Sequence, residues 1–184
     1  LEILKNYLEE KDFHSSIGIG HTRWATHGKV NDDNAHPHGN EYFSVVHNGI
    51  IENGNKLRDN LKALGHTFHS QTDSECFLVQ LTHEYEQSKN IIEAIQKAFS
   101  LMEGNSAFVI MMKGSNKLYA IKNSAPLVCG VNKDSGDVFM SSDPYALVGF
   151  TTKIYFPEDK VAHTGNPVRK ELYTTAPEGA FEFL

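Results

Sequence analysis

Residues 21–28 read His-Thr-Arg-Trp-Ala-Thr-His-Gly and continue a short segment, residues 17–21, that we interpret as a β-strand. The stretch places a cation, Arg23, where the chain leaves a strand. Asn48-Gly49 follows a second predicted strand, and Thr72-Asp73 opens a predicted helix. A guanidinium, a pair of amide donors and a carboxylate therefore stand at the ends of strands and helices. This arrangement predicts an α+β fold in which helices pack on a sheet.

The first forty residues predict a helix, a strand and a long loop. Leu1, Leu4 and Leu8 have helical spacing, and no capping residue precedes them, so we expect a helix that the chain enters from upstream. Glycines in the strand over residues 17–21 indicate that another segment packs close to its backbone. Residues 22–40 form a long polar loop, and loops of this length in compact domains are usually functional or disordered.

Helices are expected in the middle of the chain. Asn53 can cap the first of them. Thr72 and Glu75 have the spacing of a capping box, which places Asp73 in the first turn of the next helix. A further helix is predicted over residues 91–102 by the recurrence of its apolar residues.

Short strands separated by turns are expected in the second half, and such strands pair in antiparallel fashion. A second strand precedes the helices, at residues 42–47. The later strands are predicted at residues 108–112, 118–121, 127–131, 138–141 and 153–156. The sequence therefore predicts an α+β domain.

Composition excludes several classes of partner. The 184 residues suit one domain, and the net charge is −6 with a pI near 5.9. Neither Lys nor Arg forms a long run, so we expect no nucleic acid and no membrane among the partners. No apolar segment approaches the roughly 18 residues that span a bilayer, and no basic-then-apolar signal pattern is present. We therefore expect a cytoplasmic protein.

The cysteines and histidines predict neither a disulfide nor a metal site. Cys76 lies in a predicted helix and Cys129 in a predicted strand, and neither has an activating base nearby in sequence. Both fit buried free thiols. Among the ten histidines, His36 and His38 flank Pro37, but the set is too scattered for metal ligands. We expect no metal and no cofactor, and histidines that orient their neighbours by hydrogen bonds.

Arg23 and Asp73 each admit two interpretations. Alone, Arg23 fits a surface salt bridge, and Asp73 fits a helix cap that interacts with the helix dipole. A guanidinium can also bind a carboxylate bidentately, and a carboxylate can face an ammonium group. Because an amino acid is a zwitterion, a pocket that selects one needs both charges. Trp24 can wall such a pocket, and Thr26 and His27 add hydrogen-bonding groups on the same loop.

Asn48-Gly49 also has a plain and a functional interpretation. Most Asn-Gly pairs are only sharp turns. Alternatively, the Asn48 side-chain amide and the Gly49 N–H can donate hydrogen bonds to a developing oxyanion. The preceding strand would hold these two donors rigidly, as such a site requires.

These blocks closely resemble the glutaminase domain of glucosamine-6-phosphate synthase, also called glutamine–fructose-6-phosphate aminotransferase. The resemblance covers essentially the whole chain and is strongest over residues 17–75. Within class II glutamine amidotransferases, the block at residues 21–28 is specific, with Trp after Arg and His before Gly. The other matching blocks are His-Pro-His at 36–38, Val-His-Asn-Gly-Ile-Ile-Glu-Asn at 46–53 and Gln-Thr-Asp-Ser-Glu at 71–75.

The resemblance implies an amino-terminal-nucleophile hydrolase fold, a four-layer α-β-β-α sandwich. In that family an amino-terminal cysteine attacks the glutamine side-chain amide, with its own α-amine as general base. Carried onto this chain, the resemblance assigns the α-carboxylate of glutamine to Arg23, its α-ammonium to Asp73, the oxyanion hole to Asn48 and Gly49, and a loop that closes over the substrate to Trp24, Thr26 and His27.

The resemblance also implies partners. They are L-glutamine and its product L-glutamate, and a sugar isomerase domain of the same polypeptide that uses the ammonia to convert fructose 6-phosphate to glucosamine 6-phosphate. The full-length protein would be a homodimer.

Residues 1–184 contain neither the cysteine segment nor the isomerase domain. We therefore expect a class II glutamine amidotransferase domain that is truncated at its amino terminus and inactive alone. Two alternatives remain open: a non-catalytic module that binds glutamine or glutamate, and an amidotransferase for another acceptor.

Overall fold

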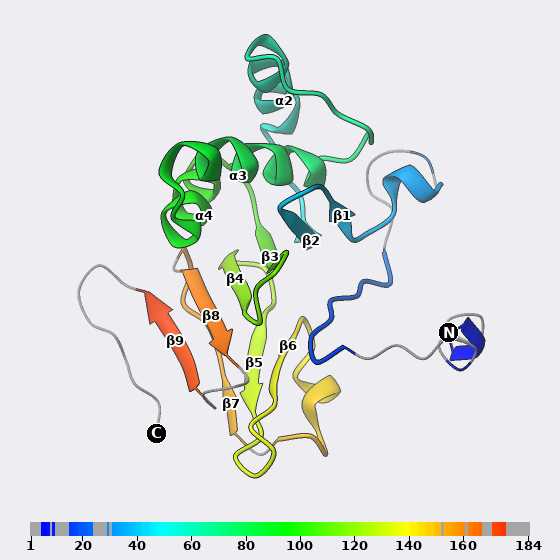
Figure 1. The fold of residues 1–184 in the computed structure, drawn as a ribbon, viewed down its shortest axis with the longest axis vertical. Coiled ribbons are helices and arrows are strands. Elements are labelled where there is room, and N and C mark those ends of the chain that lie inside the picture. The colour runs from blue at the N-terminus through cyan, green and yellow to red at the C-terminus, as the bar shows by residue number, and fades with distance from the viewer. Residues whose placement is uncertain are drawn as a thin grey trace.

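The computed structural model describes residues 5–7, 9, 15–23, 29, 31–151, 153–160, 162–166 and 171–175. In this part of the chain, two sheets and a layer of helices form the α+β fold that the sequence predicts (Figure 1). Residues 5–7 and 9 are helical, in agreement with the helix expected there. None of the described helices is long and apolar enough to cross a membrane.

The helices of the middle region begin close to the predicted positions. They are α2 (Gly54–Ala63), α3 (Ser74–Ser88) and α4 (Ile91–Ser100), with short 3₁₀ helices η1 (Asp32–Asn34) and η2 (Pro144–Leu147). The Asn90 side chain caps α4 by accepting hydrogen bonds from the N–H groups of Ile92 and Glu93. Lys89 ends α3 in a left-handed conformation, with φ of 52°.

Two helix caps differ from the prediction. Asn53 precedes α2, but its amide instead donates to the Leu101 carbonyl (2.8 Å) and accepts from the Glu103 N–H (3.1 Å). The capping box at the start of α3 is wrong, because the Glu75 carboxylate accepts from the N–H groups of His69 and Ser70, both at 2.7 Å. These donors belong to the loop before α3 and take the acceptor that a capping box would have used.

The larger sheet has the order β1-β2-β3-β4-β8-β9. Its strands are β1 (His38–Gly39), β2 (Phe43–Gly49), β3 (Ser106–Met112), β4 (Leu118–Asn123), β8 (Ala162–Asn166) and β9 (Glu171–Thr175), all paired in antiparallel fashion. The pairing of β2 with β3 extends to the register Gly49↔Ser106. The strand predicted at residues 42–47 therefore continues through Asn48 and Gly49. Strands β1, β8 and β9 were not predicted from the sequence.

The smaller sheet has the order β6-β5-β7, again antiparallel. It contains β5 (Val128–Val131), β6 (Val138–Ser141) and β7 (Lys153–Tyr155), close to the three predicted strands. Leu127 and Met140 from this region pack with Ala107 of β3 and Ala120 of β4 in a small buried cluster. The two sheets therefore face each other across this cluster.

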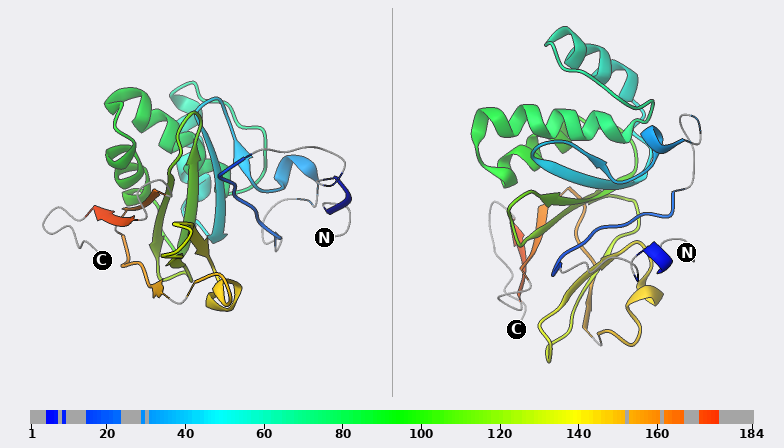
Figure 2. Two further views of the ribbon diagram at one scale, coloured as in Figure 1. Left: turned by 60° about the horizontal axis from the view of Figure 1, so that its bottom comes forward. Right: turned by 45° about the vertical axis from the view of Figure 1, so that its right-hand side comes forward.

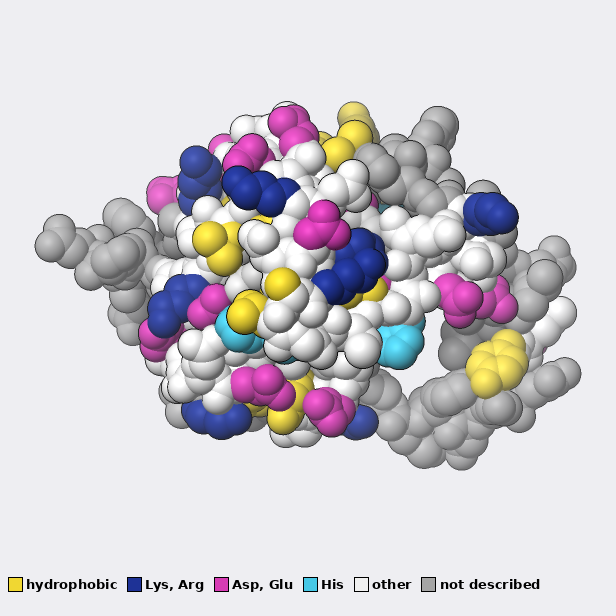
Figure 3. All heavy atoms as spheres, turned by 90° about the horizontal axis from the view of Figure 1, so that it is seen from above, with side chains coloured by type: hydrophobic (Ala, Val, Ile, Leu, Met, Phe, Trp, Pro, Cys, Tyr) yellow, Lys and Arg dark blue, Asp and Glu magenta, His cyan; other side chains and the backbone are white. Residues whose placement is uncertain are grey.

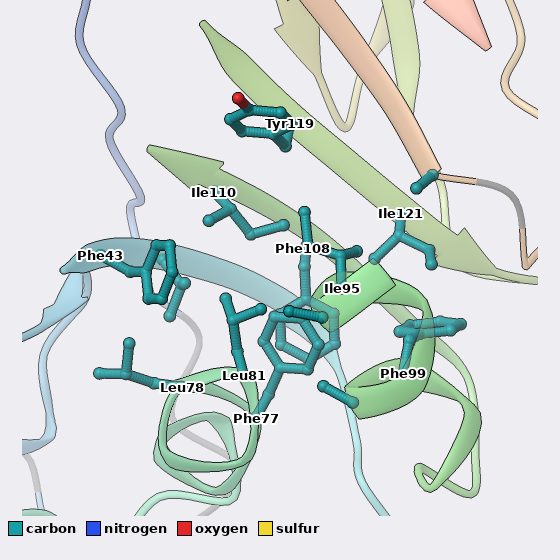
Figure 4. Close-up of a cluster of buried hydrophobic side chains, with 14 of the residues drawn as sticks. Phe43, Phe77, Leu78, Leu81, Ile95, Phe99, Phe108, Ile110, Tyr119 and Ile121 are labelled. Atoms are coloured by element: carbon teal, nitrogen blue, oxygen red, sulfur yellow. The ribbon is translucent and has the colours of Figure 1, made fainter. Parts of the chain in front are cut away.

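The main core lies on the other face of the larger sheet. Phe77 of α3 stacks on Phe108 of β3 with ring centroids 3.9 Å apart, and Phe99 of α4 meets both rings edge-on (Figure 4). Burying each such ring stabilises the fold by about 1.5–3 kcal/mol. Helices α3 and α4 thus cover this face, while α2 projects beyond α3 (Figures 1 and 2).

The strand predicted at residues 17–21 is wrong. Residues 17–21 are described without strand structure, although Gly18 and Gly20 line a cavity with Val46 and Met140. The segment therefore lies between the two sheets (Figure 2). A strand exists only through a ladder of hydrogen bonds, and this segment joins neither sheet within the described residues.

The outer side of the helical layer carries both signs of charge. Acidic and basic side chains are interspersed over this face, among isolated hydrophobic groups (Figure 3). Such a mixed surface is typical of the solvent-facing side of helices.

Candidate active site

A pocket of about 320 Å³ lies where β2 ends and α3 begins. It brings together four segments of the chain: residues 21–23, His36 before β1, the end of β2 and the start of α3. Its lining residues are His21, Arg23, His36, His47, Asn48, Gly49, Ile50, Thr72, Asp73 and Ser74. Four residues that the sequence singled out, Arg23, Asn48, Gly49 and Asp73, therefore line one pocket.

Asp73 is fixed to the segment that follows β2. Its Oδ2 accepts a hydrogen bond from the Ile51 N–H at 2.8 Å. Its other carboxylate oxygen has no hydrogen-bond partner within the described residues. Asp73 also approaches Gly54 closely, since a Cβ on Gly54 would lie 3.3 Å from the Asp73 Cβ. The aspartate therefore keeps one oxygen that can bind a ligand while the other sets its position.

Gly49 presents its N–H away from the sheet. The Ile50 N–H donates to the Asn105 carbonyl at 3.0 Å, so Ile50 and Asn105 are a hydrogen-bonded pair of the β2–β3 ladder. In antiparallel strands, hydrogen-bonded pairs alternate with pairs that are not hydrogen-bonded. The neighbouring pair, Gly49 and Ser106, is therefore not hydrogen-bonded, and the Gly49 N–H points away from β3. Within the described part of the chain, β1 pairs with Ser44 and Val45 and stops before this donor.

Only glycine fits at position 49. Its φ is +126°, which L-residues rarely adopt. A Cβ there would lie 2.0 Å from the Asn105 carbonyl oxygen and 2.8 Å from the Ser106 Cα. The outward N–H therefore depends on a backbone conformation that a side chain would prevent.

Asn48 and Arg23 both contact His21. The His21 Nε2 lies 2.8 Å from the Asn48 Oδ1, and the Arg23 N–H donates to the His21 Nδ1 at 2.9 Å. Arg23 has a φ of 48°, in the left-handed region, and its Nη2 donates to the Lys29 carbonyl at 3.2 Å. One imidazole thus contacts both the backbone of Arg23 and the side-chain amide of Asn48.

A largely buried network of hydrogen-bonded histidines and serines forms part of the pocket wall. The Ser74 hydroxyl lies 2.8 Å from the His47 Nδ1 and 3.1 Å from the His36 Nε2. The His47 Nε2 lies 3.2 Å from the Ser106 hydroxyl, and the His47 ring stacks on Phe108. This network joins the end of β2 to the first residue of α3. The expectation that histidines orient their neighbours is confirmed here.

Burial keeps these histidines uncharged. Together with the nearby imidazoles of His21, His38 and His47, it lowers the pKa of His36 to about 3. Burial lowers the pKa of His47 to about 4, although the Asp73 carboxylate opposes this effect. The pKa of His38 is also lowered by burial. Neutral imidazoles therefore lie beside the charges of Arg23 and Asp73 at neutral pH.

The loop before α3 is held by a buried carboxylate and a guanidinium. Besides its two backbone donors, Glu75 accepts a hydrogen bond from the Ser70 hydroxyl at 2.7 Å. Arg58 donates to the carbonyls of Ser70 (3.0 Å) and Thr72 (2.6 Å). These bonds fix the segment that leads into Asp73.

Neither cysteine can act as a nucleophile in this pocket. Cys76 and Cys129 are free and buried. Burial raises the pKa of Cys76 to about 11 and that of Cys129 to about 12, so both remain thiols at neutral pH. The described part of the chain also assembles no group of three or more His, Cys, Asp or Glu side chains that could hold a metal ion.

Residues 21–149, well over half of the chain, match the family model of the glutamine amidotransferase domain. The chain belongs to this family. The match begins at His21 and includes the pocket-lining segments of β2 and α3.

Among curated proteins, this amidotransferase domain is similar to glutamine–fructose-6-phosphate aminotransferases (isomerizing). It is 44% identical over 160 residues to that of Clostridium acetobutylicum, covering 85% of this chain and 26% of the relative. It is 43% identical over 157 residues to that of Mesorhizobium japonicum, with the same coverage. For the Escherichia coli K12 protein the identity is 41% over 160 residues, covering 86% of this chain and 26% of the relative. The chain thus spans about a quarter of these relatives.

Solved structures show the same fold at low identity. The domain is similar to the glutamine phosphoribosylpyrophosphate amidotransferase from B. subtilis, with a TM-score of 0.60 and 20% identity, covering 89% of this chain and 33% of that one. A structure described as the allosteric regulatory enzyme of purine biosynthesis gives 0.56 and 20% identity, covering 82% and 31%. The amino-terminal-nucleophile hydrolase fold expected from the sequence is therefore confirmed.

Three of the predicted site residues cannot be compared with the structure. Trp24, Thr26 and His27 lie outside the described residues. His21 and Ser74 line the pocket and were not predicted as site residues. The position of His21 directly before the Thr-Arg pair was the only signal in the sequence for its contact with Asn48, 27 residues away.

Proposed function

We propose that residues 1–184 are the glutamine-hydrolysing domain of an aminotransferase that releases ammonia for the conversion of fructose 6-phosphate to glucosamine 6-phosphate. The observation that supports this function is that Arg23, Asn48, Gly49 and Asp73 line one pocket of about 320 Å³. That volume is at the lower end of the range for small-molecule sites and suits a single amino acid.

In this proposal the pocket recognises glutamine by its two charges. The Arg23 guanidinium binds the α-carboxylate, and the oxygen of Asp73 that is not bonded to Ile51 binds the α-ammonium. The side-chain amide of the substrate then extends toward Asn48 and Gly49. Trp24, Thr26 and His27 belong to a loop that closes over the bound substrate.

The reaction follows from the donors at the end of β2. A thiolate attacks the carbonyl carbon of the glutamine side-chain amide, and the carbonyl oxygen becomes an oxyanion. The Asn48 Nδ2 and the Gly49 N–H donate hydrogen bonds to that oxygen. The C–N bond then breaks, ammonia leaves after taking up a proton, and water hydrolyses the resulting thioester to glutamate.

The nucleophile in this proposal is an amino-terminal cysteine of the complete protein. Its α-amine, with a pKa of about 8, is a suitable general base near neutral pH. The chemistry of the described cysteines supports this choice, since both are buried thiols with raised pKa values.

We further propose that the complete protein contains a sugar isomerase domain, forms a homodimer and acts in the cytoplasm. The names of the curated relatives support the first point, because they are isomerizing aminotransferases about four times the length of the matched region. Two free thiols suit a reducing compartment such as the cytoplasm.

The test is glutamate release from glutamine by the full-length protein, with and without fructose 6-phosphate. We expect release that the sugar phosphate stimulates. Asn48→Ala should lower kcat by about 10²–10³ and leave KM nearly unchanged, because one oxyanion donor is lost. Asn116→Ala, an exposed turn position, is the matched control and should not change either constant.

Other results of the same assay favour the alternatives. Glutamine hydrolysis that fructose 6-phosphate does not affect would indicate another acceptor. Binding of glutamine without any hydrolysis would indicate a non-catalytic module. An unchanged kcat in Asn48→Ala would remove the oxyanion role of this residue.

A further inference from the structure

We propose that His21 is a positioning residue that orients both the Asn48 amide and the Arg23 backbone with one neutral imidazole. The inference rests on the proposed function and assigns His21 a part in the same site. His21 is half-buried in the wall of the pocket. In the proposed function the substrate charges are bound by Arg23 and Asp73, and not by His21.

The bond to Arg23 determines the tautomer of His21. A backbone N–H can only donate, so the His21 Nδ1, 2.9 Å from the Arg23 nitrogen, must accept and carries no proton. In the neutral ring the proton therefore lies on Nε2. The group 2.8 Å from Nε2 must then be an acceptor, which is the Asn48 Oδ1.

This tautomer selects one of the two orientations of the Asn48 amide. With Oδ1 bonded to His21, the Nδ2 group is the end of the amide that remains to donate. The flipped amide would place two N–H donors against each other at His21, and it would turn a carbonyl oxygen toward the developing oxyanion. His21 therefore makes Asn48 a donor at the position where the reaction needs one.

The same ring stabilises the conformation of Arg23. A φ of 48° is unfavourable for a residue with a Cβ, and the bond from the Arg23 N–H to the His21 Nδ1 compensates for it. The ring itself is held by His36, whose centroid lies 4.3 Å away. One imidazole thus sets the carboxylate-binding end and the oxyanion end of the pocket.

Two substitutions in the full-length protein separate the two bonds. In His21→Asn the side-chain oxygen can replace Nδ1 as acceptor for Arg23, but the side chain is too short to reach Asn48. We expect kcat to fall by about 10- to 100-fold, less than the 10²–10³ of deleting a donor, with KM for glutamine changed by less than about threefold. In His21→Gln the amide nitrogen can donate to Asn48, but the longer side chain has no acceptor at the position of Nδ1 for the Arg23 N–H. KM should therefore rise about tenfold with kcat better preserved.

A double-mutant cycle distinguishes positioning from a general structural role. His21→Asn should lower kcat in the wild-type background and have no further effect on kcat in Asn48→Ala, because the amide that it orients is gone. His66→Asn is the matched control, since His66 pairs with His83 away from the pocket. Circular dichroism of each variant verifies the fold.

The outcomes separate the two proposals. A wild-type protein without glutaminase activity would contradict the proposed function and this inference with it. An active wild type in which His21→Asn leaves kcat unchanged, or lowers it equally in both backgrounds, would overturn the role of His21 alone. The role of His21 would also be overturned if His21→Asn and His21→Gln lowered kcat by the same factor and raised KM by the same factor.

Discussion

The two charged residues of the pocket, Arg23 and Asp73, are held in position by different contacts. Asp73 is bonded to the backbone of the segment after β2, whereas Arg23 belongs to a loop and donates to Lys29. Both side chains are only partly buried. Each would nevertheless be desolvated by a bound amino acid, which raises the contribution of both to binding.

Arg23→Ala and Asp73→Ala should therefore raise the glutamine KM much more than they lower kcat. Breaking a buried ion pair costs about 3–5 kcal/mol, and the partial exposure here reduces this to an expected rise in KM of about 10- to 100-fold. Steady-state kinetics of the full-length protein provides the measurement. Lys56→Ala and Asp59→Ala, at exposed positions of α2, are the controls. An unchanged KM would exclude the residue concerned from the pocket.

Gly49→Ala should abolish hydrolysis and lower stability. The added Cβ would meet the Asn105 carbonyl oxygen at 2.0 Å in a backbone with φ of +126°, so the end of β2 must move. We expect kcat to fall at least 100-fold, as the outward N–H is lost. Gly114→Ala, also at positive φ but with open space around it, is the control for backbone strain. Equal effects of the two substitutions on kcat would contradict a specific role for Gly49.

Among the elements, the start of α3 depends most on buried polar groups. Glu75 satisfies three donors of the preceding loop, and no apolar residue could do so. The 3.8 Å contact with Arg58 is a weaker contribution than these hydrogen bonds. The loop that carries Thr72 and Asp73 is thus positioned by the helix that follows it.

Glu75→Gln should lower the free energy of unfolding by about 1–3 kcal/mol, because the new amide nitrogen would face an N–H donor. Urea-induced unfolding followed by circular dichroism measures this change. Glu86→Gln, an exposed position on the same helix, should lie within about 0.5 kcal/mol of the parent. A parent-like Glu75→Gln would show that the loop obtains its acceptors elsewhere.

The histidine network predicts acid sensitivity. His36 and His47 have pKa values of about 3 and about 4 in the fold, against 6.5 unfolded, so the unfolded chain binds more protons below pH 6.5. The free energy of unfolding should therefore fall as pH decreases from about 6.5 toward 4, by at most about 1.4 kcal/mol per pH unit for each histidine. The half-buried His36 contributes less than His47. Above pH 7.5 neither group contributes a pH dependence.

The measurement is urea unfolding at a series of pH values. His47→Gln should flatten the slope between pH 4 and 6.5, although Asp73 at the start of α3 and the rings of His21 and His38 also face this position. His69→Gln, at an exposed side chain, is the control. A slope that is the same in His47→Gln and in the parent would exclude His47 as its source.

The sequence predicted residues with an individual chemical role better than residues that act through a network. Arg23, Asn48 and Asp73 could be named because charge and hydrogen-bonding capacity are properties of one residue. The link from His47 to Ser74 and Ser106 spans 27 and 59 residues, so local patterns hold no information about it. The capping box failed for the same reason, since donors outside the motif took the Glu75 carboxylate.

For the whole molecule, two buried clusters hold together the sheets and helices that form the pocket. The aromatic core between α3, α4 and the larger sheet fixes β2 beside α3, and the smaller cluster holds the second sheet against the other face. Helical periodicity and turn residues predicted most of these elements. Strand β8 could not be predicted locally, because its place is determined by pairing with β4 across about forty residues. Strand β9 pairs in turn with β8, so its place depends on the same long-range pairing.

Both described cysteines are buried, so substituting them tests the packing of the fold and the identity of the nucleophile together. Cys76→Ala and Cys129→Ala, separately and combined, should leave kcat of the full-length protein within about twofold, while each lowers the free energy of unfolding by about 1 kcal/mol through lost packing. The combined variant should remain sensitive to a thiol-alkylating reagent, since the proposed nucleophile is another cysteine. Glutaminase kinetics before and after alkylation provides the measurement. A folded double variant that is inactive, or active but resistant to alkylation, would contradict the proposed nucleophile, because inert buried thiols cannot account for either result.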